Sequence, residues 1–394
     1  MSPIVAGPRL PDSVHPLPNL LELTAEEVLE AFRASQRADF TRVVAQVEDA
    51  GAPLHALFDR LRQRVGPENP FQRTALFRPG ALRALFLDLH DHVMSHPVWR
   101  HPFFVRVFEG RMTAAQAATF ATAYFNQIKN TRQCVALAVG RFHGLMDLPY
   151  GPLNEPVSEI TQIALAQLVA DEYGVGAHAV EDYPELAHLL LARTHMAMYR
   201  QLFDGLDIAA ADQDAPMLWG VADNVLTQRL LAGHDAFTPL EALASVGLGM
   251  EWGVPEFFSL LLGGLIRLSQ RDGLGLTERD LEVFIAHVRY DVLHAVSVML
   301  VTSLHMTAEN HLAAVKNACN TLMAARFGMM TDMHAAVFGE PCAGLCDVGL
   351  ETRYRLTDRR IADALVRARA GVAAERVVRG SEYRARTDLP FVFA

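Results

Sequence analysis

The chain has 394 residues, of which 51% are hydrophobic and 20% charged, and its formal net charge at pH 7 is −10. This hydrophobic fraction is enough for a large core, whereas an acidic chain without basic runs argues against a nucleic-acid surface and favours a small-molecule partner. The longest apolar run, FFSLLLGGLIRL, is shorter than the roughly 20 residues of a membrane span, so we expect no membrane insertion.

The N-terminal part is expected to be a helical extension. Residues 1–22 read as an irregular, Pro-rich leader without the pattern of a signal peptide, which favours a cytoplasmic protein. Thr24 followed by Glu27 is a capping-box pattern and predicts that a helix begins there. A second helical pattern ends at the Gly/Pro-rich break GPENPF. We therefore expect residues 1–80 to form a separate helical extension.

The next part of the chain has helical periodicity almost throughout, and no strand pattern competes with it. The predicted helical segments are 80–96, 113–142, 157–174, 183–206, 215–233, 239–269, 277–304 and 309–338. We expect residues 81–340 to form one all-α helical bundle. The Gly- and Arg-containing residues 341–394 are expected to be a tail that packs on this bundle.

The four cysteines do not form a metal-binding pattern. They are Cys134, Cys319, Cys342 and Cys346, and the last two are not followed by a second pair that could complete a zinc site. We expect free thiols.

The segment FIAHVRYDVLHAVSV places two imidazoles and a carboxylate on one side of an apolar helix. His287, Asp291 and His294 stand at positions i, i+4 and i+7, which return to nearly the same direction on an α-helix. Burying these groups requires partners, because an unpaired buried charge is costly. The column is either a hydrogen-bonded cluster that ties helices together or part of a metal site.

Two further segments place ionisable groups where the core should be apolar. Glu251 lies among Leu248, Met250 and Trp252, and glutamate is rarely buried without a partner. The segment DEYGVGAH provides a further carboxylate, from Asp171 or Glu172, and an imidazole, from His178. Helices that supply Glu and His inward are the way in which helical bundles hold two iron or manganese ions.

These motifs resemble the heme-oxygenase-like diiron oxidases and oxygenases, which share the helical fold of heme oxygenase and bind no heme. The resemblance covers roughly residues 84–335. Its most specific part is HVRYDVLHA, which matches the family's His-x-x-x-Asp-x-x-His-Ala helix, and MEWGVP matches a ligand Glu followed four residues later by Pro. FEGRMTAAQAATFATAYFNQIKN is similar to an early helix of the family. The resemblance implies a heme-oxygenase-like bundle.

The resemblance also implies which residues bind metal. These are Glu251, His287, Asp291 and His294, completed by Glu172 and His178, with Asp171 as the alternative to Glu172. Many members carry the histidine about ten residues after the Glu, where this chain has Tyr183, so His188 is a further candidate. The family's early helix lines the cavity, which makes Tyr124, Gln127 and Thr131 substrate-pocket candidates. From the sequence alone, hydrogen bonds within the core are the more common role for such side chains. Asn126, Lys129, Asn130 and Gln133 are expected on the solvent-facing side of that helix.

The implied cofactors are two Fe ions, with O2 as co-substrate. The family's chemistry is oxidation of small molecules in specialised metabolism, such as N-oxygenation of amines or oxidative cleavage of amino or fatty acids. A homodimer, and a redox partner or external reductant, would fit this expectation. The alternatives are a non-catalytic helical protein that binds a ligand or partner, and a metal-free relative of the same fold, such as the thiamin-salvage enzymes.

Overall fold

The computed structural model describes residues 15–143, 148–174, 194–213 and 215–342, together with residues 363, 364 and 367. Within this part of the chain the regular elements are all helices and there is no strand, so the predicted all-α class is confirmed. The N-terminal elements are η2 (Leu20–Glu22), α1 (Ala25–Glu48), α2 (Pro53–Arg62), η3 (Pro70–Arg73), η4 (Ala75–Phe77), α3 (Ala81–Met94), η5 (Pro97–Arg100) and α4 (Pro102–Phe108). They are followed by α5 (Ala114–Val139), η6 (Gly151–Leu153), α6 (Asn154–Glu172), α8 (His195–Gly205), η7 (Ala210–Asp212), α9 (Trp219–Gly233), α10 (Pro239–Leu243), η8 (Ala244–Gly249), α11 (Val254–Asp272), α12 (Glu282–His305) and α13 (His311–Phe338).

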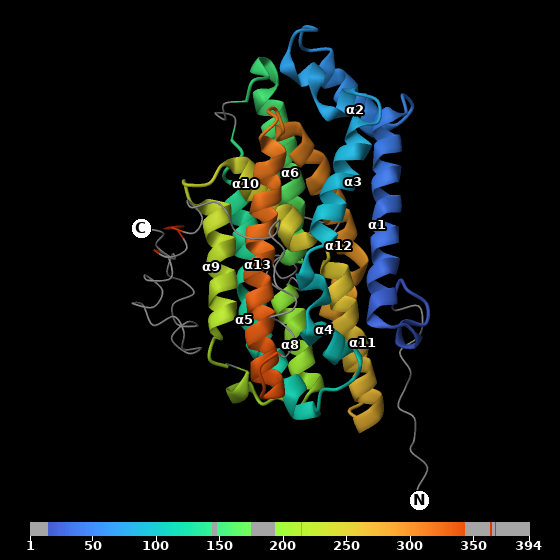
Figure 1. Cartoon of the computed structure of the whole chain (residues 1–394), viewed down its shortest axis with the longest axis vertical. Helices are drawn as coiled ribbons and strands as arrows, with labels where there is room; N and C mark the ends of the chain where they lie inside the picture. Colours follow the sequence, from blue (N-terminus) through green and yellow to red (C-terminus); the bar gives the residue numbers. More distant parts are fainter. Residues whose placement is uncertain are drawn as a thin grey trace, which may run out of the picture.

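The long helices run mostly along one direction and form a bundle (Figure 1). In it α13 packs on α9, α9 on α5, α5 on α6, α6 on α12, and α12 on α11. The apolar side chains that these helices turn inward form one continuous core. Helices α5, α6, α8, α11, α12 and α13 enclose the site described below.

Helix α1 begins as predicted and packs along the bundle. The Thr24 side chain accepts a hydrogen bond from the backbone N–H of Glu27, and the Glu27 carboxylate accepts one from the N–H of Thr24, so two of the unpaired N–H groups are satisfied. Val28 and Phe40 of α1 are buried in the same core as the rest of the bundle. The division of the chain at residue 80 stays a prediction.

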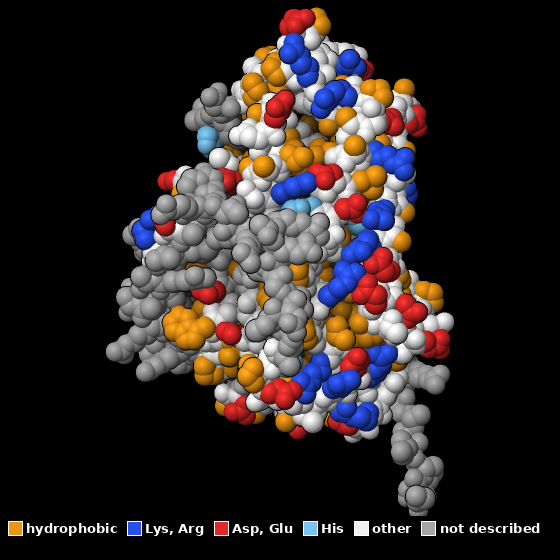
Figure 2. Space-filling model, in the orientation of Figure 1, with side chains coloured by type: hydrophobic (Ala, Val, Ile, Leu, Met, Phe, Trp, Pro, Cys, Tyr) orange, Lys and Arg blue, Asp and Glu red, His pale blue; other side chains and the backbone are white. Residues whose placement is uncertain are grey.

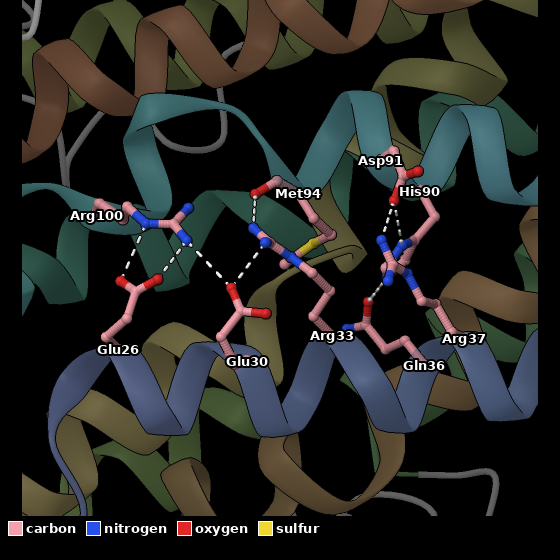
Figure 3. Close-up of polar contacts among 9 residues, drawn as sticks. All are labelled: Glu26, Glu30, Arg33, Gln36, Arg37, His90, Asp91, Met94 and Arg100. Atoms are coloured by element: carbon pink, nitrogen blue, oxygen red, sulfur yellow. Dashed lines mark hydrogen bonds and ion pairs between the residues drawn. The ribbon is translucent and has the colours of Figure 1, made fainter.

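Polar side chains line the contact of α1 with α3 and η5 (Figure 3). Arg100 pairs with Glu26 at 2.6 Å, and Arg33 donates a hydrogen bond to the Met94 carbonyl at 2.8 Å. Basic and acidic side chains alternate along this side of the surface (Figure 2). Because such pairs are largely exposed, each contributes only about 0–1 kcal/mol. The apolar face of α1 therefore stabilises this contact more than its ion pairs do.

The segment 239–269, predicted as one helix, is divided into α10, the π-helical turn η8 and α11. Gly253 has φ 76°, and a Cβ built there would lie 2.6 Å from the ring of Trp99. Only glycine adopts this left-handed conformation readily and leaves room for the ring. A Cβ on Gly247 would lie 2.1 Å from Cγ1 of Val298, so η8 packs closely on α12. The turn after η8 thereby places Glu251 beside α12.

No single helix in the described ranges is long and apolar enough to cross a membrane. The two parts of α12, Glu282–Arg289 and Asp291–His305, meet the criterion only together, with a bend of 41° between them. Of the cysteines, Cys134, Cys319 and Cys342 are free thiols, and Cys346 lies outside the described residues.

Candidate metal centre

The first cluster of possible ligands joins three helices. Glu172 is the last residue of α6, His195 is the first residue of α8, and His287 lies on α12. One ligand atom from each lies within 4.8 Å of the others. Thr194 caps α8 by accepting a hydrogen bond from the N–H of Ala197, and this cap places His195 at the helix start. Two imidazoles and one carboxylate are the donor set that non-heme iron sites commonly use.

The second cluster lies further along α12 and includes Glu251. Glu251, Asp291 and His294 are buried, with exposed fractions of 7%, 3% and 8%, and their ligand atoms also lie within 4.8 Å of one another. The column predicted on α12 is therefore shared between two clusters, with His287 in the first and the other two residues in the second.

Hydrogen bonds orient the two histidines of α12. His287 Nδ1 donates to the Val283 carbonyl at 2.7 Å, which leaves Nε2 with the lone pair that can bind a metal. His294 Nε2 lies 2.6 Å from Asp171 Oδ2. His294 Nδ1 lies 3.6 Å from a carboxylate oxygen of both Glu251 and Asp291. The two rings thus present different nitrogens to their clusters.

The buried carboxylates and imidazoles shift one another's pKa values. Burial alone would raise the pKa of Glu172, but the charges of His195, His287 and His294 and a hydrogen bond from His195 lower it to about 2. Burial would likewise lower the pKa of His294, yet the hydrogen bond to Asp171 and the nearby carboxylates of Asp291 and Glu251 raise it to about 12.

The other ligand candidates have shifted pKa values as well. Burial raises the pKa of Glu251, and burial lowers that of His287. The carboxylates near His195 raise its pKa against the effect of burial. Such opposed shifts within one cluster are typical of functional sites and also occur in structural ion-pair networks.

A divalent metal fits these residues. Asp291 Oδ2 is buried without a hydrogen-bond partner, whereas His195 Nδ1 lies 3.0 Å from Glu172 Oε2. A buried unpaired polar atom is costly, and a cation bound there would remove that cost. All six candidates offer nitrogen or oxygen and none offers sulfur, which suits iron or manganese. If each cluster held one ion, its three protein ligands would leave coordination positions for other molecules.

Residues of both clusters, all except His294, line one cavity of about 40 Å³, which is room for a few ordered waters at about 10–15 Å³ each. Tyr124, Gln127 and Thr131 of α5 line it, and their role toward a substrate stays a prediction. Gln127 also donates hydrogen bonds to Thr131 and Gln228, so it satisfies core hydrogen bonds at the same time. The remaining lining residues are Ile128, Met250, Val254, Phe257, Phe258, Arg326 and Met329, together with Glu172, His195, Glu251, His287 and Asp291.

The prediction that one side of α5 faces solvent is wrong. Asn126, Lys129 and Asn130 are buried, with exposed fractions of 1%, 8% and 0%. The reason is that α9 covers this side, where Arg229 donates hydrogen bonds to the side chains of Asn130 and Gln133.

The early half of the predicted site differs from the residues that the structure brings together. Glu172 joins the histidines, whereas Asp171 accepts a hydrogen bond from His294. His178 and His188 lie outside the described residues. The structure instead brings His195 to Glu172, and the sequence reasoning missed it. The helical repeat places His195 on the same face of α8 as the buried Met198, Tyr199 and Leu202, but it does not indicate which residue His195 meets.

Comparisons with known proteins add little to this description. The chain matches no protein-family model, and no curated protein is significantly similar to it. Among solved structures it is similar to a TenA homolog from Pseudomonas syringae pv. tomato str. DC3000, with 9% sequence identity and a TM-score of 0.48. The match covers 66% of this chain and 94% of that chain. At this level of similarity, no activity or residue role is transferred from that protein.

Proposed function

We propose that this protein is an O2-activating non-heme diiron oxidase or oxygenase that acts on a small amine- or amino-acid-derived metabolite. The observation that carries the proposal is the pair of three-residue clusters that face one cavity. Two Fe(II) ions would supply the electrons with which O2 is reduced. The sequence resemblance supports the same reading.

Different residues of the chain would bind and orient the two irons. Glu172, His195 and His287 would hold one iron, and Glu251, Asp291 and His294 the other. The Val283 carbonyl and the Asp171 carboxylate would keep the rings of His287 and His294 oriented, because metal-binding imidazoles depend on such partners. The apolar lining residues would restrict bulk water.

The alternative is a metal-free helical protein in which protonated histidines balance the carboxylates permanently. It leaves Asp291 Oδ2 without a partner, which favours the metal centre.

An anaerobic Fe(II) titration followed by exposure to O2 tests the proposal. We expect two irons per chain, and O2 uptake that is faster in the presence of a substrate from a panel of amines, amino acids and fatty acids. Failure to bind iron would favour the metal-free alternative. Two bound irons without O2 uptake for any compound would instead indicate a structural or storage role for the metal.

A further inference from the structure

Arg326 is a charged residue of the cavity that the metal centre does not use. It lies on α13, which contributes no ligand to either cluster, and its exposed fraction is 6%. It lines the same cavity as Glu251 and Tyr124. A guanidinium in this position has lost most of its hydration, which is costly unless another group compensates for it.

The contacts of Arg326 offset only part of the free-energy cost of its lost hydration. Nη2 donates a hydrogen bond to the Met250 carbonyl at 3.3 Å, whereas Nη1 is buried without a hydrogen-bond partner. The guanidinium carbon lies 5.4 Å from the ring centre of Phe257 and 5.8 Å from that of Trp99. Among the described residues, no carboxylate lies within ion-pair distance of Arg326, and Glu251 acts on it only from further away. Its planar group therefore retains unused donors beside the cavity.

The charges of the cavity favour an anion as the missing partner. If two divalent metal ions are bound, as the proposed function requires, the carboxylates of Glu172, Glu251 and Asp291 leave one positive charge, which the Asp171 carboxylate beside His294 offsets. Arg326 then adds a positive charge to the lining of the cavity that none of these four carboxylates is left to balance. Arginine matches a carboxylate especially well, because two parallel N–H groups can bind its two oxygens.

We propose that Arg326 binds the carboxylate of the substrate, so that the protein acts on a small carboxylic or amino acid and not on a simple amine. This inference rests on the proposed function for the reaction and on Arg326 for the substrate class. The cavity of about 40 Å³ admits a carboxylate group, so a longer substrate requires the lining residues to move apart.

A purely structural role for Arg326 makes a different prediction. Its hydrogen bond to Met250 lies next to Glu251 in the chain, so Arg326 could instead position that ligand. Loss of Arg326 would then weaken iron binding and leave the affinity for carboxylates unchanged wherever iron is bound.

Calorimetric titration under anaerobic conditions separates the two roles. The probes are formate, acetate and butyrate, each compared with the amide of the same length, which keeps the shape and lacks the charge. The proteins are wild type, Arg326→Gln and Arg326→Lys, with Arg229→Gln as the matched control, because Arg229 is a buried arginine outside the cavity lining. Each is titrated both loaded with Fe(II) and metal-free, and its iron content and thermal unfolding are measured.

We expect carboxylates, and not amides, to bind the wild type and Arg229→Gln. Arg326→Gln should raise the Kd for the carboxylates at least tenfold at unchanged iron content. Arg326→Lys should have a Kd between those of the wild type and Arg326→Gln, because lysine keeps the positive charge but lacks the two parallel N–H donors. Absence of carboxylate binding to the wild type, or equal Kd values in Arg326→Gln, overturns the inference. If Arg326→Gln does not fold, the Arg326→Lys comparison decides. Failure of the wild type to bind iron counts against the proposed function, and the metal-free titrations then still test Arg326.

Discussion

Asp171 and His294 show how a residue beside the metal centre could control it. The Asp171 carboxylate holds His294 Nε2 at 2.6 Å, and this contact turns Nδ1 toward Glu251 and Asp291. A carboxylate in this position fixes the ring and makes the other nitrogen more basic. Asp171 would therefore support a ligand and would not itself be one.

If Asp171 supports His294 and only His294 is a ligand, substitutions of Asp171 should weaken iron binding less than removal of His294. Asp171→Ala should weaken iron binding at the second cluster about 10–100-fold and still reach two irons per chain at high iron concentration. Asp171→Asn keeps an acceptor and should be affected less. His294→Ala should reach only one iron per chain at any concentration, while helicity stays nearly unchanged. The measurement is iron bound per chain, with His55→Ala of α2 as the control. Equal losses in Asp171→Ala and His294→Ala would make Asp171 a ligand.

The identity of the early histidine is also testable. His195→Ala should lose one iron per chain, because His195 lies with Glu172 and His287 in the first cluster. His178→Ala and His188→Ala should each retain two. Iron loss in His178→Ala, with none in His195→Ala, would restore the ligand set implied by the sequence resemblance. Thermal unfolding of all three variants shows whether any loss reflects folding.

At the scale of elements, the sequence predicted well what depends on local periodicity. The column on α12 follows from the helical repeat alone, and Thr24 with Glu27 marks the start of α1. His195 was missed because its distance from Glu172 depends on how α8 returns to α6, which no local pattern determines. The covering of α5 by α9 is a tertiary contact of the same kind. The break at Gly253 depends on Trp99, which is far away in the chain.

The close contact of η8 with α12 predicts the behaviour of Gly247. Gly247→Ala should reduce the free energy of unfolding by about 1–3 kcal/mol, because its Cβ would overlap Cγ1 of Val298. Combining it with Val298→Ala should cost less than the sum of the two single changes, since the smaller side chain makes room. Urea unfolding measures both effects. Gly66→Ala is the control, because a Cβ there meets no atom within 4 Å. If the loss of stability in the double variant equals the sum of the two single losses, a Cβ at position 247 does not overlap Val298.

At the scale of the whole molecule, a buried polar network links α1 to α11. Gln36 of α1 donates a hydrogen bond to Glu256 at 2.7 Å and accepts one from the indole N–H of Trp252 at 2.9 Å. Its oxygen also lies 3.1 Å from His90 Nε2. Glu256 is fully buried, and its second oxygen has no hydrogen-bond partner. The attachment of the N-terminal helix therefore includes a carboxyl group that is costly to ionise.

This network predicts that the stability of the molecule falls as the pH rises. Burial raises the pKa of Glu256 to about 8, against the opposing effects of a backbone hydrogen bond and Arg33, so the folded protein keeps the group neutral. The unfolded chain ionises it near pH 4.5, the ordinary value. The protonated Glu256 carboxyl therefore stabilises the fold fully at pH values below 4.5, its pKa in the unfolded chain. This stabilisation is lost as the pH rises toward the folded pKa, and it amounts to about 1.4 kcal/mol for each unit of difference between the two pKa values.

Glu256→Gln, a neutral mimic of the protonated acid, should therefore gain stability relative to the wild type between pH 5 and pH 8, by a few kcal/mol at most. Urea unfolding at both pH values measures this, with exposed Glu159→Gln as the control; an equal difference at the two pH values would show that Glu256 is already ionised in the folded protein.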